Sequence, residues 1–218
     1  MLLLAERRGS VGRGVLLMWI CEKRLQYPVK ITKTCPKTAQ LIISQYGGSD
    51  GELSASMRYL SQRYTMPLKS VGGLLTDIGT EELAHMEIIC AMVYQLTKNL
   101  TVEEAKAAGF DAYYIDHTSG IWPQAASALP FSAMEFQSKG DAVTDLTEDL
   151  AAEQKARTVY DNLLRMIPDP EIREPLKFLR AREIVHFQRF GEALERTKEK
   201  MDEKNYYYFN PEFDKEML

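Results

Sequence analysis

Two pairs of side chains in this chain of 218 residues combine a carboxylate with an imidazole at the spacing of about one helical turn. Glu82 lies three residues before His85, and Glu183 lies three residues before His186. His117 is the only other histidine in the sequence. Residues three apart project side by side from an α-helix, so each pair could offer oxygen and nitrogen ligands to a metal ion.

Apolar residues flank both pairs at alternating spacings of three and four, which predicts that each pair lies on the buried face of an amphipathic helix. The first series is Leu75, Ile78, Glu82, His85, Ile89, Met92 and Leu96, and the second is Ile172, Leu176, Leu179, Glu183, His186, Phe190 and Ala193. A structural hydrogen-bonded pair would explain one such motif. Its repetition on a second buried face favours metal ligation, because an uncompensated buried carboxylate costs several kcal/mol.

Two further glutamates are predicted to face the same interior. Glu153 shares a helix face with Leu146, Leu150 and Tyr160. Glu52 lies seven residues before Tyr59 and is nearly eclipsed with it on a helix. The predicted cluster is Glu52, Glu82, His85, Glu153, Glu183 and His186. One Glu from each of two helices and Glu-x-x-His from each of two others is the donor set of di-iron and di-manganese bundles. Four carboxylates balance two divalent cations, and these ligand types suit manganese and iron alike.

Four long helices are predicted to position these side chains, and no convincing set of strands appears. Their ranges are 37–65, broken or kinked at Gly47 and Gly48, then 68–98, 138–167 and 170–204. A long crossover over 99–137 joins the second helix to the third. The predicted fold is therefore all-α, a ferritin-like four-helix bundle with a long crossover between helices 2 and 3.

The chain length suits one domain with a sizeable core. We expect residues 1–18 to be a non-core N-terminal extension, residues 19–204 to form the dimetal bundle, and residues 205–218 to be a tail that packs on a neighbour or on the bundle surface. The first apolar patches are interrupted by arginines and are too short to span a bilayer. This order predicts cytoplasmic synthesis, with neither a secretory signal peptide nor a membrane partner.

Net charge and cysteine usage argue against a nucleic-acid-binding protein and against a secreted protein built on disulfides. The net charge is -4 and basic residues are interspersed with acidic ones, so no positive stripe is predicted that could bind nucleic acid. Cys21, Cys35 and Cys90 form no CxxC pair, which is typical of free thiols in a reducing compartment rather than of a disulfide framework.

Four segments around the cluster resemble the helices of manganese catalases. They are GGSDGELSASMRYLSQRY, LLTDIGTEELAHMEII, AAEQKAR and LKFLRAREIVHFQ, and the similarity runs from about residue 19 to residue 200. The segment MWICEKRLQYPVK is similar to the opening of the short spore-coat branch of that family, the CotJC type. The resemblance implies that Glu52 and His85 complete one manganese site, that Glu153 and His186 complete the other, and that Glu82 bridges the two.

The resemblance also implies roles for two residues beside the ions. Glu183 would be an outer carboxylate that shuttles protons, although the residue pattern alone allows it to be a direct ligand. Tyr59 resembles the outer tyrosine that hydrogen-bonds a ligand carboxylate, and a plain core tyrosine is its alternative. Some manganese catalases have an arginine where this chain has Ala152. Glu81 and Glu87 flank the first motif and are expected to be solvated.

The implied function is dismutation of hydrogen peroxide to water and dioxygen by a two-electron cycle of two manganese ions. The implied setting is a homo-oligomer, with a hexamer as one candidate, in the spore coat with other coat proteins. Longer catalases continue past the bundle, so hexamer packing and calcium binding do not transfer directly. Two alternatives stay open: a di-iron carboxylate oxidase or ferroxidase, and a structural coat component with a residual metal site.

Overall fold

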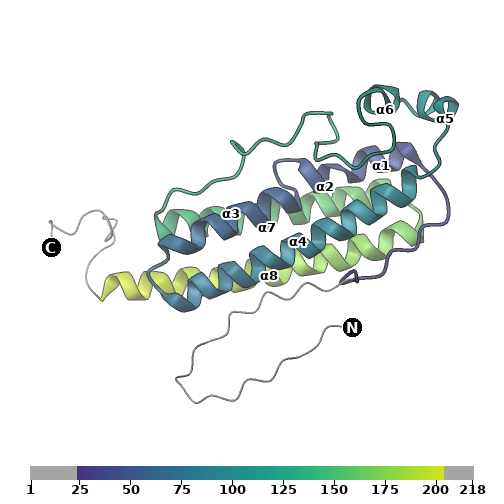
Figure 1. Ribbon diagram of the computed structural model, residues 1–218. Helices are drawn as coiled ribbons and strands as arrows, with labels where there is room; N and C mark the ends of the chain where they lie inside the picture. The colour runs from purple at the N-terminus through teal and green to yellow at the C-terminus, as the bar shows by residue number, and fades with distance from the viewer. Residues whose placement is uncertain (1–23, 204–218) are drawn as a thin grey trace, which may run out of the picture.

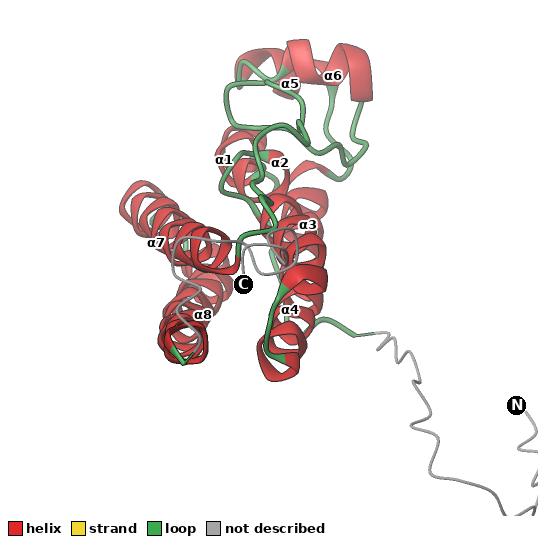
Figure 2. Ribbon diagram, turned by 90° about the vertical axis from the view of Figure 1, so that its left-hand side faces the viewer, coloured by secondary structure: helices red, strands yellow, loops and turns green. Residues whose placement is uncertain are grey.

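The structure, a computed structural model, describes residues 24–203, and within them it confirms an all-α four-helix bundle (Figures 1 and 2). The expected extension over 1–18 and the expected tail over 205–218 lie outside the described residues. The described residues contain no β-sheet, only an isolated bridge between Gln124 and Pro130. None of the described helices has an apolar stretch that could cross a membrane.

The first bundle position is filled by several short helices placed end to end (Figure 1). These are α1 (Pro36–Ile42), α2 (Ser44–Gly47), α3 (Glu52–Gln62) and the 3-10 turn η1 (Arg63–Thr65). The predicted break at Gly47 and Gly48 is therefore a full interruption. A Cβ on Gly47 would lie 2.2 Å from the backbone nitrogen of Gln124. Only glycine fits there, because the crossover passes directly against α2.

The other three bundle positions are single long helices: α4 (Lys69–Thr97), α7 (Ala142–Met166) and α8 (Pro170–Asp202). The start of α7 was predicted four residues too early. Gly140 has a positive φ of 78°, and the side chain of Asp141 caps the helix by accepting a hydrogen bond from the Thr144 N–H. The start of α8 matches the prediction, with Pro170 in the first turn and Asp169 as the cap.

The crossover carries the chain back along the full length of the bundle (Figure 1). As a result α3 and α4 form one antiparallel pair, α7 and α8 form a second, and α4 runs parallel to α7. The crossover also contains two short helices that the sequence pattern did not predict, α5 (Val102–Ala107) and α6 (Asp111–His117). They lie beyond α1 and α2, on the outside of the bundle (Figure 2).

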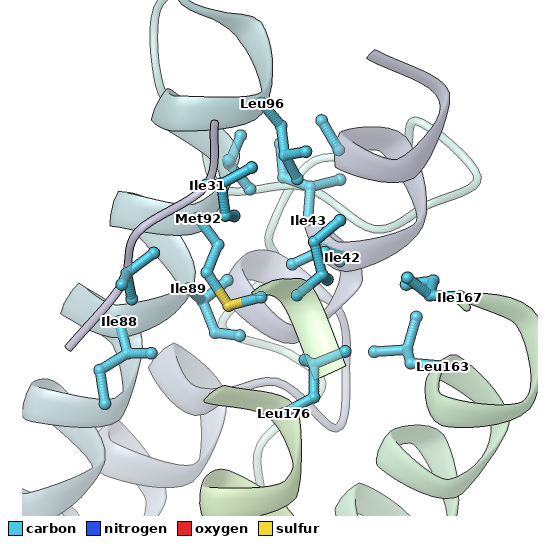
Figure 3. Close-up of a cluster of buried hydrophobic side chains, with 14 of the residues drawn as sticks. Ile31, Ile42, Ile43, Ile88, Ile89, Met92, Leu96, Leu163, Ile167 and Leu176 are labelled. Carbon is cyan, nitrogen blue, oxygen red and sulfur yellow. The ribbon is translucent and has the colours of Figure 1, made fainter. Parts of the chain in front are cut away.

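Two apolar clusters fill the interior, one toward each end. The larger cluster contains Ile42, Ile89, Met92 and Leu176 (Figure 3), and the smaller one is built around residues such as Leu75. Along α4 and α8, the predicted Glu and His residues fall between the stretches that enter these two clusters. Each buried aliphatic side chain contributes about 1.5–3 kcal/mol, so the clusters stabilise the bundle on both sides of a polar centre.

Candidate metal centre

All six carboxylate and imidazole residues predicted from the sequence lie together at the middle of the bundle. Each comes from one of four different helices, and each is at most 3% exposed to solvent. Glu52 is the first residue of α3, Glu82 and His85 are on α4, Glu153 is on α7, and Glu183 and His186 are on α8. The long helices hold all of these side chains except Glu52, and apolar packing on either side fixes the faces of those helices.

The six residues form two overlapping groups of metal-binding atoms. One group is Glu52, Glu82, His85 and Glu183, the other is Glu82, Glu153, Glu183 and His186, and within each group the ligand atoms lie within 4.8 Å of one another. The two groups share Glu82 and Glu183. Each group thus contains one histidine, one carboxylate of its own and two shared carboxylates. This division suits two neighbouring cations better than one.

Glu82 occupies the centre of this arrangement. Its Oε2 lies 2.7 Å from Nδ1 of His85, and its Oε1 lies 2.7 Å from Nδ1 of His186. The two imidazole rings are nearly parallel, with 20° between their planes and 5.6 Å between their centroids. Nδ1 of each histidine also faces its group's own carboxylate, at 3.7 Å from Glu52 and 3.5 Å from Glu153. Both histidines therefore direct Nδ1 toward the shared centre.

Burial and the charges of neighbouring groups raise the pKa values of two of the glutamates and of both histidines. Burial, reinforced by the charge of Glu82, raises the pKa of Glu52 to about 8. Burial and the neighbouring carboxylates also hold the pKa of Glu183 well above its ordinary value. Burial alone would lower the pKa of His186, but the adjacent Glu82 outweighs it and raises that pKa to about 12. His85 shifts upward for the same reasons. Protons thus balance a cluster that would otherwise be strongly negative.

The donor atoms fit a pair of divalent cations. Oε2 of Glu153 and Oε1 of Glu183 face the centre and have no hydrogen-bond partner, and Oε1 of Glu82 faces Nδ1 of His186 at 2.7 Å without hydrogen-bond geometry. Buried polar atoms normally have partners, so this group of unpaired acceptors calls for a bound species. Two divalent cations would supply four positive charges against four carboxylates and would replace the protons described above.

Two tyrosines hold the carboxylates that belong to only one group. The Tyr59 hydroxyl on α3 donates to Oε1 of Glu153 on α7, and the Tyr160 hydroxyl on α7 donates to Oε1 of Glu52 on α3. Sequence reasoning singled out Tyr59 but gave Tyr160 only a packing position. The signal was available, because Tyr160 follows Glu153 by the same seven residues that separate Tyr59 from Glu52.

Glu81 corrects a second expectation. It was predicted to be solvated, but its side chain is only 16% exposed, and Oε2 lies 3.1 Å from Nε2 of His186. Glu87, on the same helix, is exposed as expected. His117 lies away from the cluster and stacks on Trp122, with 4.7 Å between ring centroids. Sequence spacing could not reveal the role of Glu81, because its partners come from α8 and from the segment before α1.

The model of the family described as manganese containing catalase matches residues 18–216 of the chain. Protein CotJC of Bacillus subtilis (strain 168) is 52% identical over 190 residues, which cover 87% of this chain and 100% of CotJC. A probable manganese catalase of Clostridium acetobutylicum is 37% identical, covering 82% of this chain and 79% of its own length.

A solved structure gives the same result. The crystal structure of wild type KatB, a manganese catalase from Anabaena, superposes with a TM-score of 0.76 at 31% sequence identity. The superposition covers 82% of this chain and 80% of the KatB chain. The fold of most of this chain therefore has a counterpart among experimental structures.

Proposed function

Because this chain belongs to the manganese-containing catalase family, we propose that it dismutates hydrogen peroxide to water and dioxygen at two manganese ions in the bundle core. One observation carries this proposal: two buried ligand groups, each with its own histidine, overlap in Glu82 and Glu183. A structural metal site needs no such sharing. A two-electron reaction benefits from two adjacent ions, because each can change by one electron.

Five residues would hold the ions. Glu52 and His85 would complete one site, Glu153 and His186 the other, and Glu82 would bridge them. The two oxygens of Glu82 already point to different histidines, which supports the bridging role. The fixed helices would keep this geometry while the ions change charge, so little rearrangement would be needed during turnover.

Manganese ions bound there would supply the redox chemistry, one electron each, so that two molecules of hydrogen peroxide yield two of water and one of dioxygen. The protein's part is to move protons and to orient ligands. Glu183 belongs to both ligand groups and its Oε1 has no hydrogen-bond partner. It could therefore take a proton from one peroxide and return it when water forms. The Tyr59 hydroxyl orients Glu153 through its hydrogen bond.

A direct test combines elemental analysis with dioxygen evolution on one sample. Protein produced with manganese and iron both present should contain about two manganese ions per chain and should release dioxygen from peroxide. Glu82→Ala should lose both properties, whereas His117→Ala, which changes the histidine outside the centre, should keep both. Fully loaded protein that releases no dioxygen would overturn the catalase proposal. Preferential loading with iron would favour the oxidase or ferroxidase alternative, which the donor set fits equally well.

The assignment of Glu183 has its own test. Glu183→Gln should retain the two ions and lose most of the dioxygen release, because the amide cannot accept the proton. If Glu183 is a direct ligand instead, the variant should lose metal in proportion to activity.

We further propose that the protein acts in the spore coat as a homo-oligomer together with other coat proteins. The 52% identity to CotJC over its whole length supports this location. Spores that carry Glu82→Ala should assemble a normal coat but should be more sensitive to peroxide. Unchanged peroxide resistance in those spores would favour a structural coat component with a residual metal site. Light scattering of the purified protein would give the oligomeric state.

A further inference from the structure

Glu81 and Glu82 are consecutive on α4 and contact opposite edges of the same two imidazole rings. Glu82 contacts Nδ1 of His85 and of His186, at 2.7 Å in both cases. Glu81 lies on the Nε2 side, with Oε2 at 3.1 Å from Nε2 of His186 and Oε1 at 3.6 Å from Nε2 of His85. Since the rings are nearly parallel, one carboxylate can serve both of them.

Other side chains hold the Glu81 carboxylate in place. Arg182 on α8 contacts both of its oxygens, with Nε 2.8 Å from Oε1 and Nη2 3.1 Å from Oε2. Gln26, in the segment before α1, donates from Nε2 to Oε1 at 2.8 Å. The carboxylate thus has partners on α4, on α8 and on the N-terminal segment. Such a set of contacts fixes its orientation far more firmly than solvent would.

A neutral imidazole carries one N–H, and an acceptor on one nitrogen places the proton there. Glu82 faces Nδ1 of both rings, so without metal either nitrogen can carry a proton. Once cations replace the Nδ1 protons, the acceptor at Nε2 would keep the remaining proton there and leave the Nδ1 lone pair to the ion. Second carboxylates of this kind orient histidine ligands and strengthen metal binding at many sites.

We propose that Glu81 is a positioning residue that fixes both ligand histidines in the Nε2–H tautomer, with Nδ1 free to bind metal, and that Arg182 and Gln26 hold it there. The inference rests on the proposed metal centre but not on catalase activity. It carries an asymmetry: the Glu81 contact with His186 is a hydrogen bond, whereas the contact with His85 is longer. The ion bound by His186 depends more strongly on Glu81.

Glu81 could instead serve only as an ion-pair partner that ties α4 to α8. That role would reduce stability when Glu81 or Arg182 is replaced and would leave histidine chemistry unchanged. If Glu81 positions the histidines, its replacement changes the Nε2–H protons and the metal affinity even in a variant that is as stable as wild type. If it only ties the helices together, both stay unchanged in such a variant.

The test uses the full chain in four forms: wild type, Glu81→Ala, Glu81→Gln and the control Glu87→Gln, an exposed glutamate on the same helix. Manganese affinity is measured by chelator competition. Tautomers are read from ¹⁵N-histidine NMR of protein loaded with zinc(II), a diamagnetic probe. We expect Glu81→Ala to weaken manganese binding about 10- to 100-fold. Glu81→Gln, which retains an acceptor oxygen, should fall between Glu81→Ala and wild type, and Glu87→Gln should equal wild type.

In the NMR spectra the Nε2–H signal of His186 should exchange with solvent faster in Glu81→Ala, and that of His85 should change less. Unaltered affinity and unaltered signals in folded Glu81→Ala would overturn the proposal. Wild-type protein that binds metal but releases no dioxygen would overturn the catalase proposal alone. The metal affinity and the histidine tautomers would still test the role of Glu81. Wild-type protein that binds no metal would overturn both.

Discussion

The Tyr160 hydroxyl on α7 donates a hydrogen bond to Glu52 on α3, and this bond mirrors the one from Tyr59 to Glu153. Each tyrosine shares a helix with one of these two glutamates and holds the carboxylate of the glutamate on the other helix. The two halves of the centre therefore orient each other.

Replacing either tyrosine by phenylalanine should affect one ion more than the other. Tyr160→Phe frees Glu52 and should weaken the ion bound with His85, while Tyr59→Phe frees Glu153 and should weaken the ion bound with His186. A hydrogen bond to a charged group contributes about 1.5–3 kcal/mol, so each loss should lower affinity at that ion by roughly 10-fold or more.

Stepwise manganese titration followed by electron paramagnetic resonance would separate the two ions. Tyr113→Phe is a matched control, because the Tyr113 hydroxyl donates to the Gly120 carbonyl in the crossover, away from the centre. Equal loss at both ions in either variant would contradict the crossed arrangement.

Removing the ions should destabilise the whole bundle. Without cations the buried carboxylates and imidazoles must be balanced by protons alone, whereas a bound ligand stabilises the folded state by about 2.7 kcal/mol at 100 times its Kd. Chelated wild type should therefore unfold at a lower temperature than manganese-loaded wild type. Glu82→Ala should show no such difference, because it lacks a carboxylate that both groups of metal-binding atoms share. Calorimetry with and without chelator measures the effect.

Close packing of α3 on α4 should make Gly79 intolerant of a side chain. A Cβ there would lie 2.8 Å from Cγ of Leu60, whereas a Cβ on Gly73 of the same helix would meet nothing within 4 Å. Gly79→Ala should lower the free energy of unfolding by about 1–3 kcal/mol. Gly73→Ala should raise it by about 0.5–1 kcal/mol, because alanine favours a helix over glycine. Urea unfolding should show that Gly79→Ala is less stable than wild type and that Gly73→Ala is more stable. A change in the same direction in both variants would contradict the packing.

An ion pair between α7 and α8 should make stability depend on acid pH. A hydrogen bond from Arg180, together with the positive charges of Arg180 and Arg157, holds the pKa of Asp161 below its ordinary value. The Asp161 carboxylate therefore binds a proton more readily in the unfolded chain than in the folded one. The stability that its ion pair contributes is present above the ordinary aspartate pKa of about 4, and it is lost as the pH falls through the lower folded pKa. Because solvent reaches and screens this partly exposed pair, Asp161→Asn should cost about 0.5–1 kcal/mol at pH 7.

In metal-free protein the difference between wild type and Asp161→Asn should shrink as the pH falls below about 4, and it should reach zero only below the lower folded pKa of Asp161. Asp77→Asn serves as the control, since Asp77 is 63% exposed beside Arg189 and its loss should have no resolved effect. A difference that grows on acidification would contradict the direction of the pKa shift.

The buried faces of the long helices were predictable from the sequence, because three-four periodicity reports directly on which side of a helix meets a core. Every position of the two apolar series is buried in the structure. Leu150, placed on the inner face of the third helix, is only half-buried. The all-α bundle and its crossover followed from the same periodicity and from the turn-rich stretch between the helices.

Contacts between distant segments could not be predicted in this way. Glu81 is one residue from the buried face and is drawn to the centre by Arg182, which is 101 residues away. The later start of α7 depends on one cap, Asp141, and on the positive φ of Gly140. The interruption after Gly47 depends on a crossover that passes within contact distance. Each of these features is decided by tertiary partners rather than by local pattern.

The bonds that orient the centre join α3 and α4 to α7 and α8, while among residues 24–203 these two hairpins are connected covalently through the long crossover alone. A hairpin on its own would carry half of the donors but not the tyrosine that aligns its own unshared glutamate. Two cations bound at the proposed centre would therefore hold the two hairpins together. A chain cut within the crossover should remain assembled while the ions are bound. Its two halves should separate more readily once a chelator removes the ions.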